Sequence, residues 1–357
     1  MMDIQQAINS YTNWLKSFTI LVEEDLQLKC EQMKKESFIF LRATYFRWAQ
    51  VFELACPDLC QAPVVTAVGD LHIENFGTWR DSEGRLIWGI NDFDEAYPLP
   101  FTNDLVRLTT SAFLAIEENH LQISRKDAAT AVLKGYVKGL KKGGRPYVLE
   151  EKHRWLRAIA LSKLKEPVRF WKRLDKIPPL ESQLPDGLSE ILTSAVPAEI
   201  SNVKIAHRIA GMGSLGLPRY IVMGKWAGGL ICREIKYFTP SALIWAKKLD
   251  AINLYYQEII DTSIRCKDPF FSIRGEWTLR RLSPHCSKIN LHLLPVKRDE
   301  KKLLFAMGVE TANIHLGSSD KKVLLRYLKK IPDNWLYKSS KHMQEVVNKD
   351  WNDYRNN

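Results

Sequence analysis

The first part of the chain carries apolar residues at helical spacing. Over residues 1–35 they recur every three or four positions, for example at Tyr11, Leu15 and Phe18, a period that places them on one face of an α-helix. An aromatic-rich stretch at 37–54 continues the pattern. Both stretches predict helices that bury their apolar faces in a common core.

Two further helices are predicted at 103–115 and 124–140, and glycines and a proline at 143–146 end the second one. Residues 147–200 alternate short basic stretches with prolines. We expect solvated helix faces there and no chemistry.

The pattern then changes to strands. Apolar and β-branched residues at 219–223 and 230–236 flank a glycine turn, which predicts a pair of strands. A helix over 241–261, a strand over 277–282 and a helix over 303–316 follow. The chain is therefore predicted to be α+β, with a small β-rich region beside a larger helical one.

Acidic and amide side chains gather at residues 68–77 and again at 90–95, where a predicted strand over 85–90 ends. A hairpin brings the two stretches together. Because Asp and Asn are common turn residues, Asp70 and Asn75 alone would indicate no more than a turn. The second acidic stretch makes a binding site the better interpretation.

These stretches resemble the active-site unit of the protein-kinase-like phosphotransferases. Asp70 and Asn75 have the spacing of the kinase catalytic loop, Asp, four residues, Asn. Gly-Asp-Leu-His followed by Asp-Phe-Asp is similar to the motifs of aminoglycoside and choline phosphotransferases. The resemblance implies that Asp70 is the catalytic base and that His72 supports the loop, although Val68 replaces the usual first histidine. The implied magnesium ligands are Asn75, Asp92 and Asp94.

Three pieces also resemble a widespread bacterial family that carries a domain of unknown function. Its signature is Gly-Asp-x-His-x-x-Asn-Phe-Gly, then Asn-Asp-Phe-Asp-Glu, then Asp-Leu-x-Arg-Leu, and the third piece stands at 104–108 here. In kinase-like folds an aspartate at this place binds the backbone of the catalytic loop, which implies a scaffold role for Asp104. Without the family, Asn103 or Asp104 is interpreted as a helix N-cap.

A glycine-rich stretch at 208–216 precedes the two predicted strands. A kinase small lobe begins in this way, with glycines that let backbone amides approach phosphate and a cation on the third strand. Arg233 and Lys236 fall on opposite faces of that strand, and we favour Lys236, which shares a face with Glu234. The residues implied in nucleotide binding are Gly211, Gly213, Ser214, Gly216, Arg233 and Lys236.

The glycine-rich stretch follows the catalytic motif, whereas in ordinary kinases it comes first. The resemblance therefore implies a two-lobed, protein-kinase-like α+β fold that is circularly permuted, with a small β lobe and a larger, mainly helical lobe. We expect a large lobe at 1–200, a nucleotide-binding lobe at 201–300, and C-terminal helices at 301–357 that pack on the large lobe.

The implied activity is ATP- and Mg²⁺-dependent transfer of a phosphoryl group to an unidentified small-molecule or protein acceptor. One alternative is a metal-dependent phosphoesterase, which is weak because His72 alone among the histidines is near the cluster. Another is a nucleotide-binding pseudokinase module. No G-x-x-x-x-G-K-[ST] sequence occurs, which argues against a P-loop NTPase.

The amino-acid composition limits the classes of ligand and the cellular location that are expected. The net charge of +11 suits an acidic ligand such as nucleotide phosphate, but without a basic stripe and exposed aromatics no specific nucleic acid is expected. The six cysteines lack paired spacing and are expected to be free thiols. No signal peptide and no apolar run of membrane length are seen, so a cytoplasmic location without membrane insertion is expected.

Overall fold

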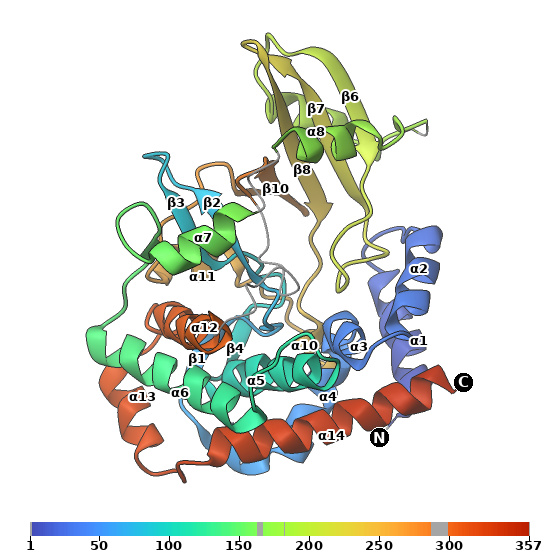
Figure 1. Cartoon of the computed structure of the whole chain (residues 1–357). Helices are drawn as coiled ribbons and strands as arrows, with labels where there is room; N and C mark the ends of the chain where they lie inside the picture. The colour runs from blue at the N-terminus through green and yellow to red at the C-terminus, as the bar shows by residue number, and fades with distance from the viewer. Residues whose placement is uncertain (1, 163–166, 182, 287–298, 357) are drawn as a thin grey trace.

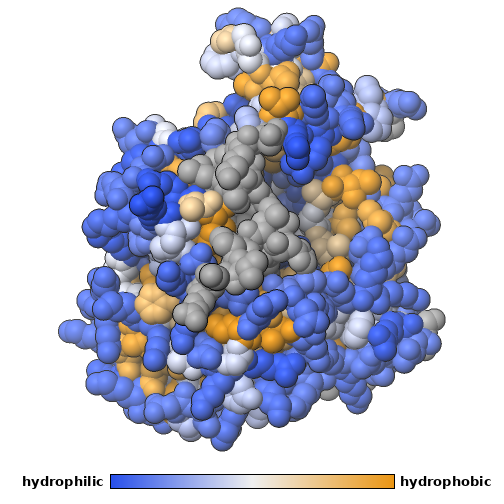
Figure 2. Space-filling view, viewed as in Figure 1, coloured by the Kyte–Doolittle hydropathy of each residue, from blue (hydrophilic) through white to orange (hydrophobic). Residues whose placement is uncertain are grey.

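The computed structural model describes residues 2–162, 167–181, 183–286 and 299–356. Helices dominate and the strands form small antiparallel sheets, so the predicted α+β class is confirmed. In Figure 1 the largest sheet stands above a body of helices. The face seen in Figure 2 is mostly hydrophilic, with apolar side chains gathered in separate patches.

The state of the cysteines and the character of the helices follow directly from the structure. All six cysteines are free thiols. Within the described ranges, none of the helices combines the length and the apolar character that crossing a membrane requires.

The N-terminal segment forms two helices, α1 (Ile4–Leu15) and α2 (Glu23–Met33). The prediction of one helix over 1–35 was wrong. After α1 the Ser17 hydroxyl donates to the Trp14 carbonyl at 2.7 Å, and the Phe18 carbonyl accepts a hydrogen bond of 2.7 Å from the Tyr237 hydroxyl. A contact with a distant strand therefore replaces helical hydrogen bonding at the break.

The aromatic stretch is also divided, into α3 (Ser37–Ala43) and α4 (Tyr45–Ala55). The predicted helix over 37–54 is interrupted at Thr44, whose backbone has φ −126° and ψ 44° and whose hydroxyl donates to the Phe40 carbonyl at 2.7 Å. This competing hydrogen bond explains the interruption.

The helical body confirms the helices predicted at 103–115, 124–140 and 303–316. Its members are α5 (Thr102–Glu117), α6 (Arg125–Lys142), α12 (Asp299–His315), α13 (Lys321–Leu328) and α14 (Trp335–Arg355). Helices α6 and α12 approach closely at Gly135 and Gly308. A Cβ at either glycine would lie 2.0 or 2.1 Å from a carbonyl oxygen of the facing helix, so the contact requires glycine.

Two small sheets carry the acidic motifs. The first pairs β1 (Val64–Ala67) with β4 (Tyr97–Pro100), and the second joins β2 (Phe76–Arg80), β3 (Leu86–Ile90) and β5 (Tyr147–Val148). A short 3₁₀ helix, η1 (Pro57–Gln61), precedes β1. Because β1 pairs with β4 and β2 pairs with β3, the loops at 68–75 and 91–96 lie side by side. The backbone amide of Asn91 donates a hydrogen bond of 3.2 Å to the Asn75 carbonyl and joins the two loops.

The largest sheet is antiparallel in the order β6-β7-β8-β10-β9. Its strands are β6 (Ser201–His207), β7 (Arg219–Trp226), β8 (Gly229–Tyr237), β9 (Ser272–Arg274) and β10 (Trp277–Leu282). The strands predicted at 219–223, 230–236 and 277–282 are confirmed, and the glycine-rich stretch is the connection between β6 and β7.

The helix predicted over 241–261 is instead two short helices, α10 (Ala242–Lys247) and α11 (Tyr256–Thr262). Lys248 ends the first one in the left-handed region, with φ 54°. A backbone in this conformation cannot continue a right-handed helix.

Helices α7 (Arg154–Ser162), α8 (Pro167–Asp175) and α9 (Leu188–Ser194) lie between the body and the largest sheet in sequence. Leu174 of α8 packs with Ile221 and Met223, whereas Leu192 of α9 packs with Val222. Alternate residues of β7 point to opposite faces, so α8 and α9 cover the two faces of the sheet. This sheet and its helices begin near residue 167, earlier than the predicted boundary at 200, and residues 287–298 of the predicted lobe lie outside the described ranges.

Candidate functional site

Asp104 fixes the backbone at the start of the 68–75 loop. Its carboxylate accepts hydrogen bonds from the amides of Val68 and Gly69 at 2.7 and 3.0 Å. His315 Nε2 lies 3.0 Å from the same carboxylate, and the Tyr136 hydroxyl lies 2.9 Å from His315 Nδ1. Asp104, Tyr136 and His315 are fully buried, so a carboxylate inside the core sets the position of the loop.

The interpretation of Asn103 or Asp104 as an N-cap was wrong, because α5 begins at Thr102 without a side-chain cap.

Gly69, in the 68–75 loop, has a backbone φ of 77°, and a Cβ there would lie 2.2 Å from the Glu95 carbonyl oxygen. Only glycine fits a loop turned this tightly against its neighbour.

Asp70 lies next in the loop and pairs with Arg107, which the sequence interpretation did not single out although it belongs to the Asp-Leu-x-Arg-Leu piece. Arg107 Nε donates to Asp70 Oδ1 at 2.9 Å, and Arg107 Nη2 pairs with the same oxygen. The side chain of Arg107 is fully buried, and its guanidinium packs over the rings of Tyr45 and Trp48 at 4.9 and 5.0 Å from their centroids. Arg107 therefore holds one oxygen of Asp70 and fixes the direction of the other.

The second oxygen, Asp70 Oδ2, faces the glycine-rich loop, since a Cβ at Gly213 would lie 3.6 Å from it. Burial raises the pKa of Asp70 above its usual value, although Arg107 opposes this effect. Oδ2 of Asp70 is therefore a carboxylate oxygen with a raised proton affinity. This is the property that a general base requires to accept a proton.

Asn75 links the two acidic stretches through its amide group. Asn75 Nδ2 donates to the carbonyl oxygens of Asp70 and Asp92 at 3.2 and 3.1 Å. Its Oδ1 is buried and has no hydrogen-bond partner among the described residues. An oxygen oriented in this way has the chemistry of a ligand for a hard cation.

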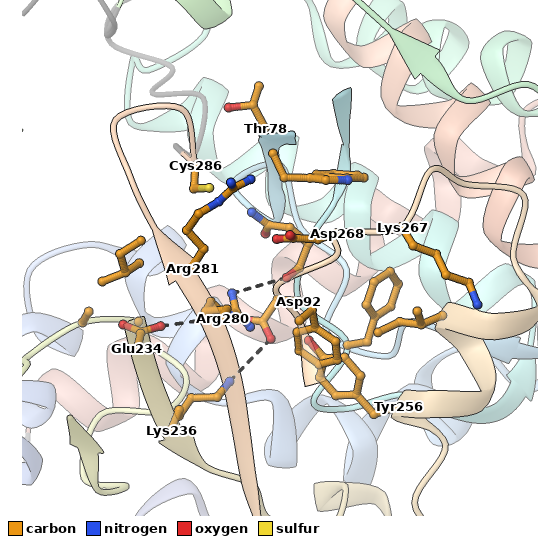
Figure 3. Close-up of a pocket in the computed structure, with 18 of the residues that line it drawn as sticks. Thr78, Asp92, Glu234, Lys236, Tyr256, Lys267, Asp268, Arg280, Arg281 and Cys286 are labelled. Atoms are coloured by element: carbon orange, nitrogen blue, oxygen red, sulfur yellow. Dashed lines mark hydrogen bonds and ion pairs between the residues drawn. The ribbon is translucent and has the colours of Figure 1, made fainter. Parts of the chain in front are cut away.

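Lys236 of β8 lies against both aspartates of the second stretch. Its Nζ is 3.6 Å from Asp92 Oδ1 and pairs with Asp94 Oδ2, and the side chain is 2% exposed. Figure 3 shows Lys236 pointing at Asp92 from the strand below it. Asp94 Oδ1 is buried without a hydrogen-bond partner within the described part of the chain, and burial and Asp92 raise the pKa of Asp94.

Arg233 is separated from this cluster. Its guanidinium packs over the Phe270 ring at 4.6 Å on the other face of β8. Glu234, on the face of Lys236, instead binds arginines: Arg219 Nη1 is 2.9 Å from Glu234 Oε1, and Arg208 pairs with Oε2. Although burial alone would raise it, these arginines hold the pKa of Glu234 well below its usual value. Of the two candidate cations, Lys236 is the one that the fold brings to the aspartates.

The glycine-rich loop at 208–218 folds down onto the 68–75 loop. Gly213 lies against the Arg42 carbonyl and Asp70, and the Ser214 hydroxyl accepts a hydrogen bond of 2.7 Å from Arg219. Gly216, with φ 97°, instead packs against Leu26 of α2. The structure brings Gly211, Gly213 and Ser214 to the cavities but places Gly216 in a packing contact.

His72 and Glu74 complete the loop. His72 is 6% exposed, and its Nδ1 accepts a hydrogen bond of 3.2 Å from the Glu74 amide. The Glu74 carboxylate, to which no role was assigned, pairs with Arg42 at 2.6 Å. Arg42 was missed because an arginine inside the helix predicted over 37–54 gives no sign of its target.

Two cavities meet at this cluster. The larger, about 440 Å³, lies between the largest sheet and the acidic loops and contains Lys236 in its wall. The smaller, about 70 Å³, contains Asp70, Asn75 and Asp94. Arg42, Asp92 and Gly211 line both cavities, so the two spaces are adjacent at the aspartate that Lys236 contacts.

Residues 21–169 match the family model of an uncharacterised protein conserved in bacteria (DUF2252). The match covers both acidic loops, Asp104 and Arg107, but ends before the glycine-rich loop and β8. No curated protein and no solved structure matches the chain. The description of this family states no activity, so the function must be argued from the site.

Proposed function

We propose that the protein is an ATP- and magnesium-dependent phosphotransferase with a circularly permuted, kinase-like, two-lobed fold. The observation that carries the proposal is the meeting of the two cavities at Asp92, with Lys236 in the wall of one and Asp70 in the wall of the other. Phosphoryl transfer needs this arrangement, because donor and acceptor must approach one phosphorus atom from opposite sides.

The arrangement of the sheet supports the nucleotide side of the proposal. Strand β6, the glycine-rich loop, β7, a turn and β8 with Lys236 follow in the order of a kinase small lobe, placed after the catalytic loop in the chain. We place the nucleotide in the larger cavity, with its phosphates toward Lys236, Gly211 and Asp92. The acceptor hydroxyl would enter the smaller cavity.

The acidic side fits a magnesium ion. Asn75 Oδ1 and Asp94 Oδ1 are buried oxygens without hydrogen-bond partners among the described residues, and Asp92 lies beside them at the boundary of the cavities. Asn75, Asp92 and Asp94 would hold the ion. When bound, magnesium neutralises charge on the phosphate oxygens during transfer.

Asp70 would orient the acceptor and take its proton. Oδ1 is held by Arg107, so Oδ2 is the oxygen that receives the proton from the acceptor hydroxyl. The hydroxyl oxygen forms a bond to the γ-phosphorus, the bond from that phosphorus to the β,γ-bridging oxygen breaks, and ADP leaves with the electron pair.

A nucleotide-binding module without transfer activity is the second candidate. The contact that favours it is the Arg107–Asp70 pair, since a buried guanidinium stabilises the ionised carboxylate and weakens it as a base.

The alternative of a metal-dependent phosphoesterase has no comparable contact in its favour. Among the described residues, the group of three side chains placed to share a metal ion is Glu36, Glu118 and His120, and these do not line either cavity.

Lys236→Met should weaken ATP binding by about tenfold or more, because the variant removes the cation beside the proposed phosphate position. Arg233→Met is the matched control, since it removes a cation from the same strand but from its other face. Titration calorimetry with a non-hydrolysable ATP analogue and magnesium measures both. Equal affinities of the two variants would refute the placement of the nucleotide.

A further inference from the structure

The larger cavity also contains a set of guanidinium groups, one of which, Arg280, lies beside the proposed magnesium ligand Asp92. Arg280 and Arg281 of β10 and Arg265, which follows α11, line it. Figure 3 shows Arg280 between Glu234 and Asp92, with Arg281 extending toward Cys286 and Thr78. The three side chains line one cavity from two separate segments, Arg280 and Arg281 from opposite faces of β10.

These arginines are incompletely hydrogen-bonded. Arg265 Nε and Nη1, Arg280 Nη2 and Arg281 Nε are buried and have no hydrogen-bond partner among the described residues. Arg265 is held by ring contacts, with its guanidinium 4.8 Å from both Trp79 and Phe93. A buried N–H group without an acceptor lowers the stability of the fold by about 1–3 kcal/mol, and by more when it is charged. A bound group with acceptor oxygens would remove this cost.

The charges of these arginines are only partly balanced: Arg280 Nε lies 3.9 Å from Glu234 Oε1, and Glu310 interacts with Arg265. Asp268 interacts with all three guanidinium groups, and its carboxylate accepts a hydrogen bond from the Phe270 amide at 3.0 Å. Lys267 at the rim pairs with Asp261 at 2.6 Å. Burial lowers the pKa of Arg265 although Glu310 opposes the effect, whereas Tyr256, Asp92 and Glu234 raise the pKa of Arg280 despite its burial, so the shortage of counter-charge is at Arg265.

We infer that Arg265, Arg280 and Arg281 form a binding site for a phosphate group that requires no magnesium. Guanidinium forks present paired N–H donors at the spacing of phosphate oxygens, and they bind such groups best where water is excluded. Close to Asp92, in contrast, the carboxylate would repel a phosphate unless a cation lay between. We therefore expect phosphate binding around Arg265 and Arg281 to need no magnesium, unlike binding at Asp92.

The test is titration calorimetry with inorganic phosphate and with pyrophosphate in the presence of a chelator, at constant ionic strength. The wild-type protein should bind one of these anions saturably. Arg265→Gln and Arg281→Gln should each weaken that binding by about tenfold or more. Arg274→Gln is the matched control, because Arg274 of the neighbouring strand β9 bonds to Ser194 at 2.6 Å and does not line the cavity.

Thermal unfolding followed by circular dichroism checks that each variant is folded. If Arg265→Gln loses its structure because the rings of Trp79 and Phe93 lose their partner, Arg281→Gln decides the result. Absence of saturable binding to the wild-type protein would overturn the inference. So would equal affinities of the wild-type protein and a folded Arg281→Gln variant.

Two further arms identify the source of the phosphate group. Phosphate binding that persists with a saturating ATP analogue and magnesium supports a second, phosphate-bearing ligand, whereas competition supports a phosphate of the nucleotide itself. Asp92→Asn should bind phosphate at least as well as the wild-type protein, because it removes a negative charge. This outcome is independent of phosphoryl transfer, so the anion site stands or falls separately from the proposed function.

Discussion

Replacing Asp70 with asparagine should lower the rate of ATP hydrolysis by about 10²–10⁴-fold while the affinity for ATP stays within about twofold. The amide keeps an oxygen for Arg107 but cannot take a proton at the position of Oδ2. Since the nucleotide is placed in the other cavity, only the transition state loses an interaction. Background hydrolysis, in which water acts as the acceptor, requires no knowledge of the natural acceptor.

Hydrolysis by Asp70→Asn at the wild-type rate would refute its role as the base. If neither protein hydrolyses ATP although both bind it with magnesium, the non-transferring nucleotide-binding module becomes the better account. The affinity measured on the same preparations serves as the control for correct folding of the site.

Replacing Asp104 with alanine should lower the free energy of unfolding by about 3–5 kcal/mol. The change leaves the amides of Val68 and Gly69 without their acceptor and removes the partner of His315, all in a fully buried setting. Urea denaturation measures the loss. Asp333→Ala, at an exposed aspartate before α14, should stay within about 0.5 kcal/mol of the wild-type protein.

A loss below about 1 kcal/mol in Asp104→Ala would show that the loop is held by other contacts. The comparison also distinguishes a residue that positions the loop, Asp104, from a residue that takes part in the reaction, Asp70. A folded Asp104→Ala variant should lose hydrolysis together with stability, whereas Asp70→Asn should lose hydrolysis alone.

The sequence was informative where the signal is local. The helical period at 103–115 and 124–140 predicted α5 and α6, and the alternation at 277–282 predicted β10. The acidic stretches indicated which residues would gather, because a hairpin must bring its ends together. The opposite directions of Arg233 and Lys236 followed from the strand period alone.

The sequence failed where a distant contact decides. The end of α1 depends on a tyrosine of β8, and Thr44 divides the aromatic helix through one hydroxyl. Nothing local shows that Gly216 packs on Leu26, or that α8 and α9 cover a sheet formed later in the chain. Arg107 stood inside a recognised motif, yet its partner is 37 residues away.

The central claim is that nucleotide and magnesium bind together at the meeting point of the two cavities. Titration calorimetry with a non-hydrolysable ATP analogue, with and without magnesium, tests it on the wild-type protein and on Asp92→Asn. We predict that magnesium tightens nucleotide binding to the wild-type protein by about tenfold or more and has little effect on Asp92→Asn. Tight magnesium binding without nucleotide, or the same magnesium dependence in both proteins, would contradict the account.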